Sequence, residues 1–408
     1  MSAAQRLPGR VLVVGMGRSG EAVARACLAR GCEVLAVDDA PGDAPVRRAR
    51  AAGAELVARP DRSRLADLAR WADLVVVSPG VPAAHPVFGL GGGVEVCSEV
   101  EIGASIAAAP LVAVTGTNGK TTVVTLVTRM LVASGMRAVA AGNIGLPLVE
   151  AAGRGAEVLV VEVSSFQLAH TRGFRPAVAA WLNVAPDHLD WHPSWSDYVA
   201  SKARIWAKQA SGDVAIGNSE DPVVAEQLAL APGRRVSFGL GRGDWCLAGG
   251  VLRAPDGAGL LARSELWRQL PSDVLNALAA LAAAEASGAE RGRSAEVLRR
   301  FEGLAHRVEL VREVAGVRYY DDSKATTPDA VLAALAGFDS VVLVAGGRSK
   351  GLDLGPLAAA AERLRAVVAI GESAGELEEV FAGSGVPTAR AGSMDQAVGL
   401  AAGTAQAG

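Results

Sequence analysis

A glycine-rich loop that carries a lysine and two threonines is the strongest chemical signal in this sequence. The loop lies in VAVTGTNGKTTVV, after an apolar run and before a helical pattern. In such loops the backbone amides bind phosphate oxygens, the lysine neutralises the β- and γ-phosphates, and the adjacent hydroxyl binds Mg²⁺. The two glycines stand closer together than in the usual phosphate-loop pattern. The segment predicts ATP binding by Gly116, Thr117, Asn118, Gly119, Lys120, Thr121 and Thr122.

A carboxylate ends another apolar run, VLVVE, at Glu162. A buried carboxylate is costly unless it is paired or binds a cation, and Mg²⁺ prefers oxygen ligands. We therefore predict that Glu162 binds Mg²⁺. The alternative is a core carboxylate that accepts hydrogen bonds from backbone amides.

Two histidines and two aspartates, Asp187, His188, Asp190 and His192, follow the apolar run AAWLNV. A group of this kind, just beyond a strand in a chain with a phosphate loop, is typical of a functional site. Further on, Lys202 stands one helical turn after a tyrosine. Its spacing alone predicts a lysine on a solvated helix face.

A second glycine loop, GMGRSG, follows the first apolar run of the chain. Gly15, Gly17 and Gly20 have the dinucleotide-binding spacing, and Asp38 ends the next apolar run, where an acidic residue binds a ribose hydroxyl. The pattern favours a diphosphate at the helix N-terminus. An NAD-dependent dehydrogenase, another diphosphate-bearing ligand, and a tight turn without a ligand all fit this loop.

The elements that carry these residues are short β-branched runs that alternate with Ala/Leu/Arg-rich helical patterns. This alternation predicts parallel sheets covered on both faces. We predict three α/β domains: a Rossmann-like domain at 1–109, a central P-loop ATPase-like domain at 110–299, and a Rossmann-like domain at 300–408. The stretch GLGRGDWCLAGGVLRAPDGAGL predicts a β-hairpin.

The composition limits the class of partner. Half of the residues are apolar and one fifth are charged, and the net charge of −3 provides no basic field for nucleic acid or anionic lipid. The four scattered cysteines, the missing signal-peptide pattern and the missing long apolar run predict a cytoplasmic protein without a membrane span.

Several further motifs, taken with these loops, resemble the Mur ligase family of ATP-dependent amide-forming enzymes. These motifs are SPGVP, GNIGLP, EVSSFQL, FEGLAHRVE, DDSKATTPDA and GGRSKGLD. They are most similar to the members that add D-glutamate to UDP-N-acetylmuramoyl-L-alanine in peptidoglycan precursor synthesis. The resemblance implies a monomer that uses ATP, two Mg²⁺ ions and a carbamylated Lys202. Alternatives are another amide ligase of the Mur and folylpolyglutamate family, or a nucleotide-binding protein that has lost ligase activity.

The resemblance also implies a role for individual residues. Lys120, His188 and Lys202 would be catalytic, and Thr121, Glu162, His188 and Lys202 would bind metal. Asn276, Arg307 and Asp322 would contact ATP. The substrates would be bound by Gly17, Ser19, Asp38, Ser78, Pro79, Gly80, Asn143, Lys324, Thr326 and Lys350, of which the last three match positions for D-glutamate.

The sequence departs from the family pattern at three places. Ser272 and Asp273 stand where the family has His-Asn, which puts the adenine site in doubt, and Thr327 stands where asparagine is usual. The family also has a further strand and helix after the segment MDQAVGLAAGTAQAG. We therefore expect an incomplete C-terminal domain whose last helix leaves apolar faces unburied, and weak binding of D-glutamate.

Overall fold

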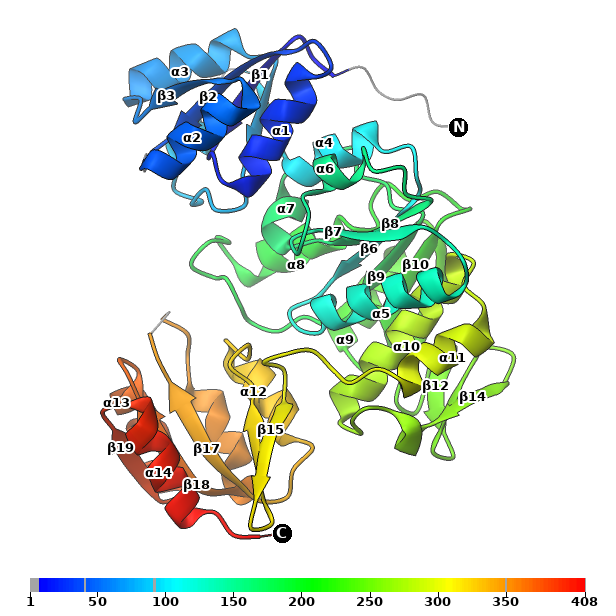
Figure 1. The fold of residues 1–408 in the computed structure, drawn as a ribbon, viewed down its shortest axis with the longest axis vertical. Coiled ribbons are helices and arrows are strands. Elements are labelled where there is room, and N and C mark those ends of the chain that lie inside the picture. The colour runs from blue at the N-terminus through cyan, green and yellow to red at the C-terminus, as the bar shows by residue number, and fades with distance from the viewer. Residues whose placement is uncertain (1–6, 40–41, 91–92, 349–350, 408) are drawn as a thin grey trace. The chain divides into compact units, whose positions relative to one another are not determined.

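The computed structural model describes residues 7–39, 42–90, 93–348 and 351–407. The chain forms two compact units, each built of sheets and helices, which confirms the predicted α/β class (Figure 1). The first unit comprises the chain up to residue 184 together with 188–261 and 276–298, and the second comprises 185–187, 262–275 and 299–408. Among the helices of the described residues, none combines the length and apolar character needed to span a bilayer.

The first unit begins with a parallel sheet of strand order β3-β2-β1-β4-β5. Its middle strand is buried from Val11 to Val14, as expected for a parallel strand with helices on both faces. The strands are β1 (Arg10–Val14), β2 (Glu33–Asp38), β3 (Glu55–Ala58), β4 (Leu74–Val77) and β5 (Glu95–Ser98), and the helices are α1 (Arg18–Leu28), α2 (Asp43–Ala52), α3 (Arg62–Trp71), η1 (Pro86–Gly89) and α4 (Glu99–Ile106).

The same unit contains a second, nine-stranded sheet of order β14-β13-β12-β11-β10-β9-β6-β8-β7. Strand β6 lies between β8 and β9 and is parallel to both, so the carboxyl ends of these three strands share one edge. The strands are β6 (Leu111–Thr115), β7 (Ala138–Gly142), β8 (Val158–Glu162), β9 (Val178–Trp181), β10 (Val214–Asn218), β11 (Arg234–Gly239), β12 (Trp245–Ala248), β13 (Val251–Arg253) and β14 (Gly259–Ala262). The helices are α5 (Lys120–Ala133), α6 (Leu148–Ala151), α7 (Ser165–Ala169), α8 (Trp195–Ala203), α9 (Pro222–Leu230), α10 (Pro271–Ala286) and α11 (Arg291–Arg299). The first turn of α10, at 271–275, belongs to the second unit.

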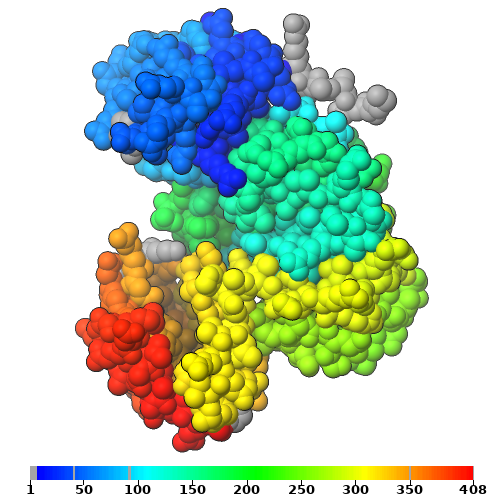
Figure 2. Space-filling model, viewed as in Figure 1, coloured from blue at the N-terminus to red at the C-terminus, as the bar shows by residue number. Residues whose placement is uncertain are grey.

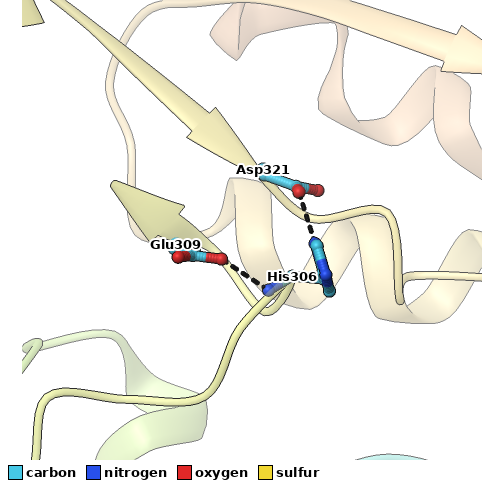
Figure 3. Close-up of side chains that lie close together, drawn as sticks. All are labelled: His306, Glu309 and Asp321. Atoms are coloured by element: carbon cyan, nitrogen blue, oxygen red, sulfur yellow. Dashed lines mark hydrogen bonds and ion pairs between the residues drawn. The ribbon is translucent and has the colours of Figure 1, made fainter. Parts of the chain in front are cut away.

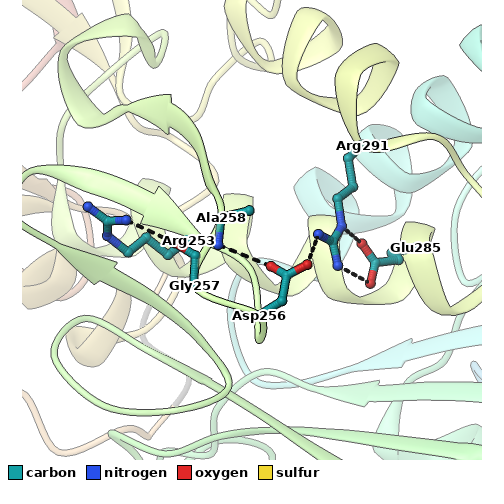
Figure 4. Close-up of polar contacts among 6 residues, drawn as sticks. All are labelled: Arg253, Asp256, Gly257, Ala258, Glu285 and Arg291. Carbon is teal, nitrogen blue, oxygen red and sulfur yellow. Dashed lines mark hydrogen bonds and ion pairs between the residues drawn. The ribbon is translucent and has the colours of Figure 1, made fainter.

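The predicted hairpin is present, because β12 pairs antiparallel with β13. It extends the nine-stranded sheet at its edge, where β12 continues in parallel next to β11. Arg291 of α11 ties the turn after β13 to the helices, since it contacts Asp256 at 2.6 Å and also Glu285 of α10 (Figure 4). In the space-filling view, the yellow-green atoms of this segment pack against the yellow atoms of α11 (Figure 2).

The second unit contains an antiparallel pair of strands, β15 and β16, and a parallel sheet of order β17-β18-β19. Leu335, Leu357 and Phe381 of the surrounding helices share one hydrophobic core with residues of β18. The strands are β15 (Glu309–Val314), β16 (Val317–Asp321), β17 (Val341–Gly346), β18 (Leu364–Ile370) and β19 (Thr388–Ala391), and the helices are η2 (Arg263–Glu265), α12 (Pro328–Leu335), η3 (Gly355–Arg363), α13 (Ala374–Phe381) and α14 (Met394–Thr404).

The last helix, α14, was expected to leave its apolar faces unburied, and this prediction is wrong for one face. Ala397 is fully buried and packs with Ala401 against Val368 and Ala391 of the parallel sheet. Three large apolar side chains that flank this buried stripe stay partly exposed, Met394, Val398 and Leu400, at 60%, 47% and 37%. The small alanine side chains let this helix lie on the sheet.

Candidate active site

The phosphate loop connects β6 to α5 at the shared edge of the nine-stranded sheet. Gly119 has a φ of 84°, which favours glycine, and a Cβ atom there would lie 2.3 Å from Oδ1 of Asn276. The structure therefore brings Asn276 of α10 against the loop. Asn183, which follows β9, accepts hydrogen bonds from the amides of Thr117 and Asn118 at 3.0 and 2.8 Å. Asn183 was not predicted from the sequence, although a polar residue just after a buried strand is a usable signal.

Two lysines converge on one carbonyl group of this loop. Lys120 Nζ donates to the carbonyl oxygens of Gly116 and Thr117 at 2.9 and 3.0 Å. Lys202 Nζ, from α8, donates to the same Gly116 oxygen at 2.8 Å. The site therefore concentrates positive charge where the loop would bind phosphate groups.

Lys202 is only 2% exposed, so the prediction of a solvated helix face was wrong. Helix α8 begins at the N-cap Ser194, whose side chain accepts from the amide of Asp197, and its buried face lies toward the phosphate loop. Tyr198 donates or accepts a 3.0 Å hydrogen bond with Thr117 Oγ1, and its ring lies 4.8 Å from Lys202 Nζ. The helix is thus attached to the loop by two side chains one turn apart.

Glu162 lies at the carboxyl end of β8, in register with Val114 of β6, and is 2% exposed. Its Oε2 accepts from Thr121 Oγ1 at 2.9 Å and its Oε1 accepts from Asn143 Nδ2 at 2.8 Å. A carboxylate, a hydroxyl and an amide therefore meet within reach of the phosphate loop. Their oxygen atoms form a donor set that suits Mg²⁺.

His188 and His192 lie in the segment between β9 and α8. His188 has a φ of 55° and its ring lies 4.6 Å from that of Phe166. The ring of His192 shares a 3.0 Å hydrogen bond with Ser165 Oγ, and burial lowers the His192 pKa to about 4. His192 is therefore neutral near pH 7 and has a structural contact of its own, and the chemical role of His188 stays a prediction.

The N-terminal glycine loop lies at the carboxyl end of β1. A Cβ atom on Gly20 would lie 2.0 Å from the carbonyl oxygen of Gly15, so the close approach of helix and loop requires glycine. Asp38 Oδ2 accepts from the amide of Met16 at 2.8 Å, and Ser78 Oγ donates to the carbonyl of Gly15 at 2.6 Å. Two predicted substrate residues thus hold this loop in place. The others, Gly17, Ser19, Pro79 and Gly80, lie at the start of α1 and just after Ser78.

An aromatic group that was not predicted from the sequence lies beside Ser78 and Pro79. The rings of Phe88 and His170 stack at 4.8 Å, and Trp191 lies edge-on to both. Together with Phe166 these residues line a small cavity, and Trp191 Nε1 donates to the carbonyl of Val81 at 3.4 Å. These side chains come from separate segments of the chain, so spacing alone could not have found them.

The remaining predicted ATP residues lie in the second unit. Asp322, which follows β16, accepts from the amide of Val308 at 3.0 Å, and burial raises the Asp322 pKa. Its neighbour Asp321 contacts His306 Nδ1 at 2.6 Å, and this contact lowers the Asp321 pKa to about 2 (Figure 3). Glu309 accepts from the amide of His306 at 2.8 Å. These bonds fix the segment that carries Arg307.

The predicted D-glutamate residues Lys324 and Thr326 lie on the exposed turn between β16 and α12. Lys350 lies outside the described residues. Thr327, which replaces the usual asparagine, is the N-cap of α12 and accepts from the amide of Ala330 at 3.3 Å. Because threonine and asparagine both cap helices, this departure leaves the turn intact.

Comparison with family models finds two matches. Residues 114–284 match the model described as the Mur ligase middle domain, and residues 306–408 match that of the Mur ligase glutamate ligase domain.

Comparison with curated proteins finds relatives along nearly the whole chain. A UDP-N-acetylmuramoylalanine–D-glutamate ligase from Frankia casuarinae is 45% identical, and the match covers 98% of this chain and 87% of that protein. A protein of the same name from Pelotomaculum thermopropionicum is 41% identical, with 92% and 85% covered.

Solved structures share the fold. A pseudomurein peptide ligase type C from Methanothermus fervidus has a TM-score of 0.61 at 19% identity, covering 98% of this chain and 95% of that chain. UDP-N-acetylmuramate-alanine ligase from Thermotoga maritima has a TM-score of 0.59 at 20% identity, covering 94% and 90%. At these identities the likeness concerns the fold alone.

Proposed function

Because the chain belongs to the Mur ligase family of ATP-dependent ligases, we propose that it joins D-glutamate to UDP-N-acetylmuramoyl-L-alanine. The observation that carries the proposal is the convergence of Lys202 from α8 and Glu162 from β8 on the phosphate loop. In this reading the N-terminal glycine loop binds the diphosphate of a UDP-sugar. This use of the loop replaces the NAD-dependent alternative.

The proposed reaction has two steps. An oxygen of the alanyl carboxylate attacks the γ-phosphorus of ATP and ADP leaves, which gives an acyl phosphate. The amine of D-glutamate then attacks the acyl carbon, loses a proton, and expels phosphate to leave an amide. Phosphorylation is needed because a carboxylate oxygen is a poor leaving group.

The residues of the phosphate loop act in the first step mainly by position and charge. The amides of Thr117 and Asn118 are fixed by Asn183, and loop amides bind the phosphate oxygens of ATP. Lys120 stabilises the charge that develops on the transferred group. Asn276, beside Gly119, contacts the adenosine part of ATP. We propose Arg307 and Asp322 as further ATP contacts.

Magnesium ions, when bound, neutralise phosphate charge and bring the γ-phosphate to the carboxylate. We propose two ions, with Thr121 and Glu162 as ligands for one. His188 and a carbamate on Lys202 would bind the other, next to Asn143 and the alanyl end of the substrate.

The carbamate forms when the Lys202 nitrogen adds to the carbon of CO₂ and releases a proton. Two ammonium groups on the Gly116 oxygen repel each other, and carbamylation turns one of them into an anion that Lys120 attracts. The repulsion between the two ammonium groups makes Lys202 unfavourable as a purely structural residue. It therefore supports a carbamate at this position.

The proposal also includes the second substrate and the cellular context. Lys324, Thr326 and Lys350 bind the carboxylates of D-glutamate. The protein acts as a cytoplasmic monomer on small molecules, without nucleic acid or membrane partners. The described cysteines Cys27, Cys32, Cys97 and Cys246 are free thiols, which suits a reducing compartment.

A phosphate-release assay tests the proposal. Release from ATP is expected only when UDP-N-acetylmuramoyl-L-alanine is present, and sustained turnover only when D-glutamate is added as well. An assay with NAD provides the control for the dehydrogenase alternative. Release that needs neither substrate, or NAD binding that the UDP substrate does not displace, would contradict the proposal.

A further inference from the structure

Arg268 joins two segments of the second unit. Its Nε and Nη2 donate to the two carboxylate oxygens of Asp273, each at 2.8 Å. Its Nη1 donates to the carbonyl oxygens of Arg307 and Val308 at 2.6 and 2.5 Å. The first turn of α10, which carries Asp273, is thereby tied to the segment at 306–308.

The ion pair between Arg268 and Asp273 is largely buried and has a well-defined geometry. Asp273 is 2% exposed and the Arg268 side chain 22% exposed, so both charges are largely removed from water. Such a pair is stabilising only when its geometry is good and its remaining donors are satisfied. The planar guanidinium fulfils both conditions here, because it binds the carboxylate with two nitrogens and the backbone with a third.

The backbone that Arg268 holds has an unusual conformation. His306 and Val308 have φ values of 61° and 47°, a region that is unfavourable for a β-branched residue such as valine. The amide of Val308 donates to Asp322 at 3.0 Å, while its carbonyl accepts from Arg268. Arg268 and Asp322 therefore hold this strained segment from its two sides.

We propose that Arg268 and Asp273 are positioning residues of the ATP site. They fix the backbone at 307–308 and thereby the places of the Arg307 side chain and of Asp322. The inference rests on the proposed function, which assigns these two residues to ATP. Asp273 stands one helical turn before Asn276, the proposed adenine contact, in α10.

This role accounts for one departure from the family pattern. Asp273 stands where asparagine is usual, and each of its oxygens accepts a hydrogen bond from Arg268. Its contribution to ATP binding is therefore made through Arg268 and the backbone of Arg307.

The test compares Arg268→Met with Arg299→Met in the full chain. The control, Arg299→Met, removes an ion pair with Glu265 at 2.7 Å in which the two side chains are 40% and 41% exposed. We expect Arg268→Met to raise the KM and the Kd for ATP by about tenfold, which corresponds to the loss of one charge-assisted hydrogen bond. The kcat and the KM for the UDP substrate should change little. Arg299→Met should leave all four values unchanged.

A double variant separates position from stability. Arg268→Met with Asp273→Leu removes both charges, so its melting temperature should exceed that of Arg268→Met, while its Kd for ATP stays high. An ATP affinity equal to wild type in folded Arg268→Met, or one that recovers with stability in the double variant, would overturn the inference. A wild-type chain that binds ATP but ligates nothing would instead contradict the proposed function, and the Kd comparison would still test the inference.

Discussion

Replacing Glu162 with glutamine should separate metal binding from folding at the end of β8. The side chain is 2% exposed and accepts one hydrogen bond on each oxygen, from Thr121 and Asn143. Glutamine keeps the shape and the bond from Asn143, and the Thr121 hydroxyl can rotate to accept from the new amide. We therefore expect a loss of about 1 kcal/mol or less in unfolding free energy.

The effect on the metal should be larger, because a hard cation loses an anionic oxygen. A hydrogen bond or contact to a charged group contributes roughly 1.5–3 kcal/mol, which corresponds to roughly 10- to 100-fold in affinity. The assay varies free Mg²⁺ at saturating ATP and measures phosphate release, with half-saturation as the readout.

Glu99→Gln is the matched control for this variant. Glu99 is also buried, at 1% exposure, but lies in α4 and accepts from the amide of Val149 at 2.7 Å. It should leave the Mg²⁺ dependence unchanged. A Glu162→Gln protein with wild-type half-saturation would refute the assignment and would leave Glu162 as a core carboxylate.

Two further changes test separate parts of the site, and a third tests a buried carboxylate outside it. Lys120→Ala should abolish ATP turnover and keep the Kd for the UDP substrate, as measured by calorimetry, and equal loss of both would refute separate sites. Lys202→Ala should lose activity that formate restores in part by replacing the carbamate oxygens, and full activity without formate would rule out the carbamate. Burial raises the Glu99 pKa from 4.5 to about 7, so the native state keeps a proton that the unfolded state releases, and stability falls as pH rises through this window. Glutamine cannot ionise, so urea unfolding should show Glu99→Gln to be more stable than wild type by up to about 3 kcal/mol at pH 8, with little difference at pH 4. A Glu99→Gln protein that is less stable than wild type at pH 8 would contradict this assignment of the raised pKa.

Local sequence signals predicted the parts of the fold that depend on few neighbouring residues. The apolar runs at β1, β6 and β8 are buried strands, and both glycine loops follow such strands. Strand β7, in contrast, is AVAAG, and alanine does not favour a strand. Its position is set by pairing with β8, which periodicity along the chain does not reveal.

The site residues that were misread or missed depend on contacts between distant segments. Lys202 is buried because α8 packs on a loop more than eighty positions earlier in the chain, so its own helix gave no signal. Asn183 and Trp191 act through partners on other strands and loops. The partner of Asp273, Arg268, is close in the sequence, but Arg268 also binds the backbone of Arg307 in a distant segment, which the sequence does not reveal.

The most direct test of the account follows an oxygen atom. UDP-N-acetylmuramoyl-L-alanine labelled with ¹⁸O in the alanyl carboxylate is incubated with the protein, ATP, Mg²⁺ and D-glutamate, and the phosphate is analysed by mass spectrometry. An acyl phosphate passes one carboxylate oxygen to each phosphate, so the account predicts singly labelled phosphate in equal amount to the new amide. Unlabelled phosphate, or labelled phosphate without the glutamyl product, would contradict it.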